Sequence, residues 1–335
     1  MASTEHVGTT RSTESDDTTA DRTEGDASAR TGAAADHGAT AAADPVLSLS
    51  EVTKAFGPET AVDDVSLDVR SGELLTFLGP SGCGKTTTLR TIAGLEEPTE
   101  GEIALGDEVV AGDGAFVPPE QRDVGIVFQN FALFPHLTVR ENIAFGLTDA
   151  DAAESEARVD ELLELVEMTE HGEKTPDQLS GGQKQRVALA RSLAPEPEVL
   201  LLDEPFSNLD VRLRVEMREE VRRILKKAGV TAISVTHDQE EALSISDRVA
   251  VMNDGQIEQV GRPESVFERP ESKFVASFLG RASFLEGELR DGKVDTGIGR
   301  FDAVTLEGYD TVYDGAPVDV LVRPDDLRAT PASPE

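Results

Sequence analysis

The 335-residue chain carries 31 Lys and Arg against 65 Asp and Glu, and this formal net charge of −34 at pH 7 disfavours a nucleic-acid partner, because it repels phosphate backbones. With 38% apolar residues it can bury a sizeable core, yet it has no apolar run of the ~18 residues that a membrane span needs and no signal-peptide pattern. Its single cysteine, Cys83, excludes an internal disulfide and fits a reducing, intracellular compartment.

The acidic residues are spread along the whole chain, and Arg outnumbers Lys among the basic residues. In molar salt the Debye length falls to about 3 Å, which screens the self-repulsion of so acidic a protein. The composition therefore predicts a halophilic protein; the alternative is an ordinary acidic one.

The first 44 residues contain two large apolar side chains, Met1 and Val7, among Thr, Ser, Ala, Gly, Asp and Glu. Such a segment cannot bury enough surface to offset its ordering entropy, so we expect a disordered acidic tail over 1–44. Apolar residues then alternate with polar ones over 46–69, which predicts short strands with one solvated face.

A glycine-rich turn follows the apolar run 74–78 and precedes a helical pattern over 86–93. It matches G-x-x-x-x-G-K-[ST], in which backbone N–H groups surround phosphates, the lysine adds a point charge and the hydroxyl reaches Mg²⁺. The alternative is a turn that needs glycine only for its shape. We assign nucleotide binding to Gly79, Pro80, Ser81, Gly82, Cys83, Gly84, Lys85, Thr86 and Thr87, with Thr86 also a Mg²⁺ ligand.

A second candidate phosphate site stands at the start of a helical stretch over 184–193. A serine with two glycines there offers a hydroxyl and free N–H groups. One chain would then have two phosphate sites for one nucleotide. Two copies paired head to tail resolve this, each giving its serine loop to the nucleotide on the other's glycine-rich turn. The loop consists of Leu179, Ser180, Gly181, Gly182 and Gln183.

The apolar run 199–202 ends at Asp203 and Glu204. This is typical of a buried parallel strand with acids at its carboxyl end. In a phosphate-loop fold, Asp203 would hold Mg²⁺ and Glu204 would be the general base for the attacking water. The alternative is a pair of solvent-facing acids at a strand end.

At this point the residues resemble a known family, the ATP-binding subunits of ABC transporters, from about Val46 to Leu279. Gln129 follows a predicted strand over 124–128, as in the family's Q-loop, and His237 follows one over 232–236, as the switch histidine does. Residues 207–210, Ser-Asn-Leu-Asp, match the D-loop, and Phe56 stands where the family places an aromatic that stacks on adenine.

The resemblance implies an α/β fold: a P-loop NTPase with an ABC helical subdomain and a small C-terminal β extension, using ATP and Mg²⁺. It makes Glu204, His237 and Gln129 catalytic, with Gln129 also at the Mg²⁺. Asp210 belongs to the D-loop, and Phe56 contacts ATP unless it is a core residue.

The rival class is a soluble, non-transport ABC ATPase that acts on DNA or ribosomes. Those relatives carry a long coiled-coil insertion between Q-loop and signature, or two ATPase halves in one chain. Here 50 positions separate Gln129 from Leu179, and there is one glycine-rich turn. The interval fits the small helical subdomain of a transporter ATPase, expected at about 130–193. A short packed helix within it is predicted by an i, i+3, i+4, i+7 stripe of Val159, Leu162, Leu163 and Val166.

The apolar segment 131–136 follows Gln129 in a predicted loop. The resemblance implies that it forms, with Gln129, a groove that receives a coupling helix of a membrane permease, so we expect an exposed apolar patch there; local packing is the alternative. The implied assembly is a homodimer bound peripherally to permease subunits at the cytoplasmic face of the cell membrane. An extracytoplasmic solute-binding protein would act with it indirectly.

Residues 117–123 and 131–139 look like the importer ATPases for sugar, polyamine, molybdate, thiamine and ferric iron. Residues 206–214 and 240–248 look most like the ferric-iron members. We therefore expect iron(III) uptake, with polyamine, sugar, thiamine or molybdate import as alternatives.

The ATPase domain is expected over 45–280, followed by a short β extension over 281–335. Alternating stretches at 284–289 and 318–322 indicate its strands. It resembles the barrel-like regulatory domain of the same importers. At about 55 residues it is short for a self-contained barrel, so the resemblance alone does not predict that it binds a regulatory ligand.

Overall fold

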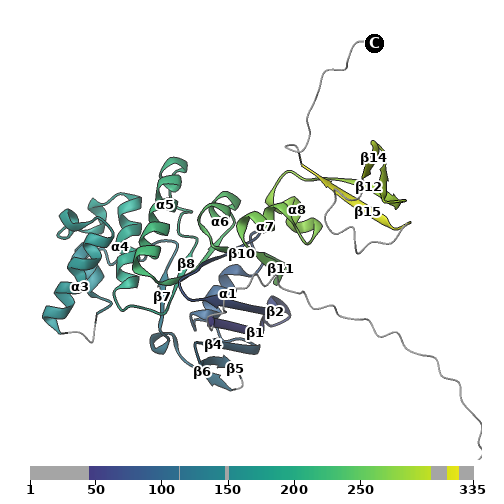
Figure 1. The fold of residues 1–335 in the computed structure, drawn as a ribbon. Coiled ribbons are helices and arrows are strands. Elements are labelled where there is room, and N and C mark those ends of the chain that lie inside the picture. The colour runs from purple at the N-terminus through teal and green to yellow at the C-terminus, as the bar shows by residue number, and fades with distance from the viewer. Residues whose placement is uncertain (1–44, 113, 148–150, 303–314, 324–335) are drawn as a thin grey trace, which may run out of the picture. The chain divides into compact units, whose positions relative to one another are not determined.

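The computed structural model describes residues 45–112, 114–147, 151–302 and 315–323 (Figure 1). The tail expected over 1–44 lies outside the described residues. No helix in the described part of the chain is both long and apolar enough to cross a membrane.

The first layer is a five-stranded sheet in the order β2-β1-β4-β5-β6. Its strands are β1 (Pro45–Phe56), β2 (Glu59–Arg70), β4 (Glu100–Leu105), β5 (Glu108–Gly112) and β6 (Ala115–Phe116), and adjacent strands are antiparallel. The alternation read from the sequence is confirmed, because Leu47, Leu49, Val62 and Val65 are buried between exposed or half-buried residues. The expected short length is wrong, since β1 and β2 each have 12 residues.

The second sheet has six strands in the order β11-β10-β3-β9-β8-β7. The bounds are β3 (Leu74–Leu78), β7 (Val124–Val127), β8 (Val199–Asp203), β9 (Thr231–Thr236), β10 (Arg248–Asn253) and β11 (Gln256–Gly261). All neighbouring pairs are parallel except β10 with β11. Every residue of β3 and β9 is buried, as expected for central strands covered on both faces.

Helices follow these strands in the order βα. They are α1 (Lys85–Ile92) after β3, α5 (Val211–Ala228) after β8, α6 (Gln239–Ile245) after β9, and α7 (Pro263–Glu268) and α8 (Lys273–Leu279) after β11. Because the carboxyl ends of parallel strands share one edge of a sheet, the loops before α1, α5 and α6 meet there.

A helical region separates β7 from β8. It contains α2 (Val139–Ala144), α3 (Ala152–Leu165) and α4 (Gly181–Leu193), with short 3₁₀ turns at Thr169–His171 and Pro176–Gln178. The predicted packed helix is confirmed as α3, since all four stripe residues are buried in one core with α4 residues such as Val187 and Leu189.

The last sheet has the order β14-β13-β12-β15, with β12 (Ser283–Arg290), β13 (Lys293–Thr296), β14 (Gly299–Asp302) and β15 (Pro317–Val322). Strands were predicted at 284–289 and 318–322, and β12 and β15 occupy them. Its core is small: Leu289, Val294 and Val320 are its buried apolar residues among those described.

Candidate functional site

The site is built at the carboxyl ends of four neighbouring parallel strands. The glycine-rich turn follows β3, His237 follows β9, Asp203 and Glu204 end β8, and Gln129 follows β7. These positions are up to 158 residues apart in the chain, and the strand order brings them to one edge.

Two glycines make the turn around the N-terminus of α1 possible. Gly84, the N-cap of α1, has φ 103°, and Gly82 has φ 86°, both in the left-handed region. A Cβ on Gly79 would lie 2.3 Å from the carbonyl oxygen of Met252, and one on Gly84 would lie 2.3 Å from that of Ala61. The turn therefore has a shape that only glycine allows, with its N–H groups at a helix N-terminus.

Lys85 and Thr86 lie at the start of α1. Lys85 is buried, and its Nζ donates to the carbonyl oxygens of Gly79 and Pro80 at 2.7 Å each. Its charge is thereby held at the mouth of the turn. Ser81 is exposed on the turn, whereas Cys83 is buried beneath it. Thr87 extends the same helix.

Thr86 and Asp203 converge as oxygen donors. The hydroxyl Oγ1 of Thr86 lies 3.5 Å from Oδ1 of Asp203. Burial raises the pKa of Asp203, Arg90 acts to lower it, and Glu204 acts to raise it again. A hydroxyl and a carboxylate are hard oxygen ligands, so this pair fits Mg²⁺.

Glu204 is held between two side chains. Its Oε1 lies 3.2 Å from Nδ1 of His237, and its Oε2 lies 3.4 Å from Nε2 of Gln129. Glu204 itself has φ 44°, which is uncommon for a residue with a side chain. The three predicted catalytic residues are therefore in contact. Gln129 contacts Glu204 and not Asp203, so its predicted place at the Mg²⁺ stays a prediction.

The loop 207–210 forms hydrogen bonds with both Glu204 and Gln129. Oγ of Ser207 donates to the carbonyl oxygen of Glu204 at 2.9 Å and accepts from Nε2 of Gln129 at 3.1 Å. Nδ2 of Asn208 donates to the carbonyl oxygen of Gln129 at 2.7 Å. Asp210 caps α5 by accepting from the N–H of Leu213. The D-loop match identified this loop in the sequence, but the hydrogen bonds of Ser207 and Asn208 to Glu204 and Gln129 were not predicted.

The Ser180 loop forms the N-terminus of α4. Ser180 and Gln183 make a capping box, with Ser180 Oγ accepting from Gln183 N–H at 3.3 Å. A Cβ on Gly182 would lie 3.0 Å from Sδ of Met217, and one on Gly181 would lie 3.1 Å from Leu209. Leu179 is buried beside them. The two glycines thus pack against Met217 of α5 and against Leu209 just before it, whereas Ser180 is exposed.

Phe56 lies at the end of β1 and is 47% exposed, so the reading as a core residue is wrong. Nζ of Lys54 lies 4.7 Å from its ring centroid. The ring therefore has one face over a cation and is exposed enough to stack on a base.

The segment 131–136 is exposed only in part: Leu133 and Phe134 are half-buried, and the exposed residues are Ala132, Pro135 and His136. Phe131 is buried, with 7% of its surface exposed. Its side chain joins the buried apolar cluster that includes Val187 and Leu189 of α4. Arg191 of the same helix donates to the carbonyl oxygens of Phe131 and Ala132 at 2.9 and 2.7 Å. Phe145, at the end of α2, is the exposed aromatic; its ring packs on Phe134 with 4.3 Å between centroids. It was not predicted, because it stands apart from the motif.

Asn142 explains how this segment is held. It is fully buried in α2, its Oδ1 accepts from the N–H of Phe134, and its Nδ2 donates to the carbonyl oxygens of Phe134, Leu137 and Thr138. The local sequence contains no signal for this role, because the polar residues Arg140 and Glu141 precede Asn142 in the same short helix.

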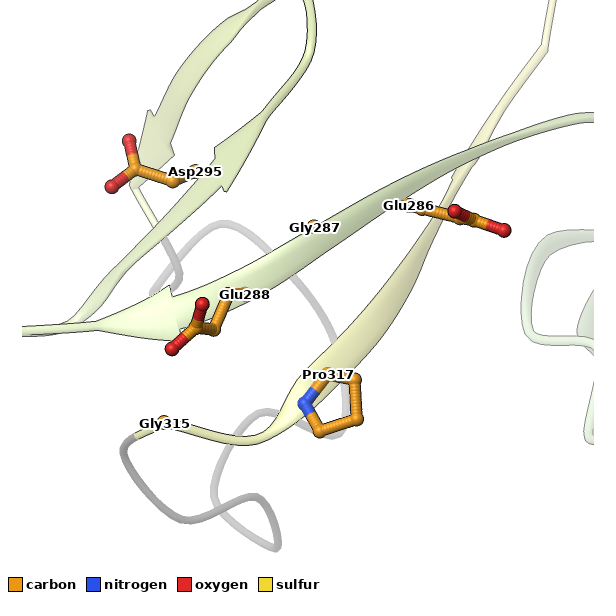
Figure 2. Close-up of a pocket in the computed structure, with 6 residues that line it drawn as sticks. All are labelled: Glu286, Gly287, Glu288, Asp295, Gly315 and Pro317. Atoms are coloured by element: carbon orange, nitrogen blue, oxygen red, sulfur yellow. The ribbon is translucent and has the colours of Figure 1, made fainter.

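A hollow lies on the C-terminal sheet (Figure 2). The carboxylates of Glu286, Glu288 and Asp295 line it. Two of them are already paired, Glu288 with Arg290 and Asp295 with Arg300. No group of three or more His, Cys, Asp or Glu suited to a metal occurs within the described ranges.

A family model described as ABC transporter matches residues 62–207. The spermidine/putrescine import ATP-binding protein PotA 1 of Pseudomonas aeruginosa is 50% identical over 297 residues, which cover 84% of this chain and 78% of that protein. The trehalose/maltose import ATP-binding protein MalK of Thermococcus litoralis is 49% identical over 290 residues, or 83% and 78% of the two chains. This chain belongs to the ABC transporter family. It is the ATP-binding subunit of an ABC importer, as the motifs indicated.

Two solved ABC structures have the same fold. An ATP-binding cassette dimer, in a post-hydrolysis state bound to ADP and Pi, aligns with a TM-score of 0.56 at 32% identity, over 65% of this chain and 98% of that chain. CbiO1 of Clostridium perfringens, part of the ABC transporter complex cbiONQ, aligns with a TM-score of 0.61 at 30% identity, over 68% and 93%. The predicted α/β P-loop NTPase fold is confirmed, and family membership makes this ABC subunit an ATPase.

Proposed function

We propose that two copies of this chain bind two ATP molecules, each between the glycine-rich turn of one copy and the Ser180 loop of the other, and hydrolyse them to drive a membrane permease. The observation that carries the proposal is the placement of Glu204, held by His237 and Gln129, beside the Thr86–Asp203 pair. The dimeric relative with ADP and Pi bound supports the pairing.

The residues divide the chemistry among them. Glu204 accepts a proton from water as the water oxygen bonds to the γ-phosphorus and the bond to the β–γ bridging oxygen breaks, giving ADP and phosphate. His237 and Gln129 orient the Glu204 carboxylate, and Lys85 stabilises negative charge on the phosphates. Mg²⁺ held by Thr86 and Asp203 would neutralise charge on the β- and γ-phosphate oxygens. Phe56 would stack on the adenine.

The test is the variant Glu204→Gln, with Glu219→Gln as its matched control because Glu219 is an exposed residue of α5. An amide can accept a hydrogen bond from water but cannot take its proton. We expect Glu204→Gln to bind ATP like the parent and to lose nearly all phosphate release, while the control keeps both. Hydrolysis at the parent rate by Glu204→Gln would remove the assigned role.

For the solute, we propose a polyamine. Among the similar importers described above, PotA 1 is a spermidine/putrescine protein, and a second PotA, of Rubrobacter xylanophilus, is also 50% identical. MalK, a trehalose/maltose protein, supports sugar as the second candidate. The expectation of iron(III) rests on sequence likeness in two segments, and none of these relatives is named for iron.

Uptake by cells decides among these solutes, because the ATPase need not touch the solute. Cells that lack this chain should lose uptake of labelled spermidine while uptake of maltose and of ferric iron continues. The parent chain should restore uptake and Glu204→Gln should not. Loss of iron or sugar uptake in place of spermidine uptake would reassign the solute.

The permease contact is proposed at the surface formed by Phe145, Phe134 and the segment 131–136. Phe145 is exposed and packs on Phe134, which belongs to the segment that follows Gln129, and Gln129 in turn contacts Glu204. This chain of contacts would connect the permease surface to the hydrolytic site. We therefore propose that the pair is bound peripherally at the cytoplasmic face of the membrane.

A further inference from the structure

Glu204 is one of the residues that line a small cavity of about 60 Å³. The walls of this cavity come from the end of β8, the loop after it, the end of β9, and the helices α5 and α6. The lining residues are Glu204, Ser207, Arg214, Thr236, His237, Asp238 and Glu241. Two of them, Glu204 and His237, belong to the proposed catalytic group; Arg214 and Asp238 have no role in the function described so far.

Arg214 of α5 joins two loops across this cavity. Its Nη2 donates to the carbonyl oxygen of Leu209 at 3.3 Å, and its Nη1 donates to Oδ2 of Asp238 at 3.3 Å. The Arg214 side chain is 29% exposed and that of Asp238 is 24% exposed, so the contact is largely shielded from water. One guanidinium thus reaches both the loop after Glu204 and the loop that carries His237.

Asp238 is fixed on every side. Oδ2 also accepts from Nη2 of Arg218 at 2.6 Å, and Oδ1 accepts from the N–H of Glu241 at 3.1 Å, which caps α6. Its own N–H donates to Oγ1 of Thr236 at 3.1 Å. Because Asp238 directly follows His237 in the chain, its contact with Arg214 restricts where the His237 side chain can lie.

The contacts close a ring. On one side Leu209 belongs to the loop in which Ser207 holds the Glu204 carbonyl at 2.9 Å, and on the other His237 lies 3.2 Å from the Glu204 carboxylate. Both routes from Arg214 therefore end at Glu204, one through its backbone and one through its side chain.

We propose that Arg214 is a positioning residue for ATP hydrolysis, which keeps His237 against Glu204 by tying the loop 207–210 to Asp238. The proposal rests on the hydrolytic site proposed above. A guanidinium suits this task because its planar fork presents several donors in fixed directions, whereas a lysine ammonium on a flexible stem cannot hold both acceptors in the same geometry.

The test compares Arg214→Lys and Arg214→Gln with Arg212→Gln. Arg212 is on the same helix but is 92% exposed and pairs with Glu216. We expect both Arg214 variants to lower kcat about 10- to 100-fold, as a small misplacement of catalytic groups does. KM for ATP and the midpoint of thermal unfolding should stay close to the parent's, and the control should behave as the parent does. Arg214→Lys at the parent kcat would overturn the proposal, because it would show that the charge alone suffices.

A double-mutant cycle with Asp238→Asn separates positioning from general destabilisation. If Arg214 and Asp238 act as one unit, Arg214→Gln/Asp238→Asn will have the kcat of the slower single variant. Multiplication of the two single losses would contradict the proposed ring. If Arg214→Gln does not fold, Arg214→Lys and Asp238→Asn give the same decision in the same assay.

Glu204→Gln, measured beside these variants, keeps the two proposals apart. An inactive Glu204→Gln with a fully active Arg214→Lys contradicts only the positioning role. A fully active Glu204→Gln contradicts the hydrolytic site itself.

Discussion

Nη1 of Arg122 donates to the carbonyl oxygen of Ile92 at 2.7 Å, although 30 positions separate the two residues. Ile92 ends α1, the helix whose first residue is Lys85. The same guanidinium donates to the carbonyl oxygens of Thr91, Val117 and Val110. Arg122 therefore joins the C-terminus of the nucleotide-binding helix to the antiparallel sheet. Burial lowers the pKa of Arg122, yet a guanidinium remains charged.

Replacing Arg122 with Met should destabilise the fold. The side chain is 6% exposed, so its loss leaves buried carbonyl oxygens without donors, at a cost of about 3 kcal/mol in the free energy of unfolding. Urea unfolding of Arg122→Met and of the exposed control Arg212→Met measures this. Equal losses in the two variants would show that the four carbonyl contacts contribute little.

Glu241 makes stability depend on pH. Burial raises its pKa to about 8, while Thr236 and Arg218 act to lower it, Asp238 to raise it and Arg214 to lower it. The folded chain then holds a proton that the unfolded chain has released, because the ordinary pKa is 4.5. The contribution of Glu241 to stability is full below that ordinary pKa and is lost as the pH rises through the folded pKa, at about 1.4 kcal/mol per pH unit.

The variant Glu241→Gln has no titratable carboxyl group at this position. The difference in free energy of unfolding between the variant and the parent should therefore shift in favour of the variant from about pH 5 to about pH 8. Urea unfolding across that range, with Glu219→Gln as control, gives the difference. Parallel curves for parent and variant would show that Glu241 is ionised in the folded chain.

Phe145→Ala tests the proposed permease surface. Phe145 is 56% exposed, so truncation should barely change folding or the ATPase rate of the isolated protein. Uptake by cells should fall about tenfold or more if the ring anchors a permease helix in its groove. The control is Ile298→Ala, a 68% exposed residue of the C-terminal sheet region. Normal uptake with Phe145→Ala would show that the permease does not bind at this surface.

The charge excess predicts that folding requires salt. At ~0.1 M salt the Debye length is about 10 Å, so the repulsion within a chain of charge −34 is no longer screened. Circular dichroism during stepwise dilution of KCl should show cooperative loss of structure. A folded signal at that salt concentration would identify an ordinary acidic protein.

Much of the site could be predicted because its signals are local. The glycine-rich turn, the apolar run before Asp203 and the Ser180 capping box each lie within a dozen residues, and the spacing of fixed residues carries the chemistry. The positions of Glu204, His237 and Gln129 at one sheet edge followed from the strands before them.

The remaining contacts depend on pairs that are distant in the chain. Arg191 donates to the carbonyl oxygen of Phe131 from 60 positions away, and Arg214 donates to Asp238 from 24 positions away. Arg, Asp and Asn are usually solvated surface residues, so nothing in the local pattern distinguishes these from their neighbours. These residues acquire their hydrogen-bond partners only when α4 packs on the loop after Gln129 and α5 packs on α6.

The central claim, that two copies close around ATP through the Ser180 loop, is tested most directly by light scattering in the Glu204→Gln background. With Mg²⁺ and ATP, Glu204→Gln should have the mass of two copies, and adding Ser180→Arg should leave ATP bound to single copies. Ser71→Arg, at an exposed turn residue, is the control and should pair like Glu204→Gln alone. Pairing of the Ser180→Arg variant to the same extent as the control would contradict the head-to-tail arrangement.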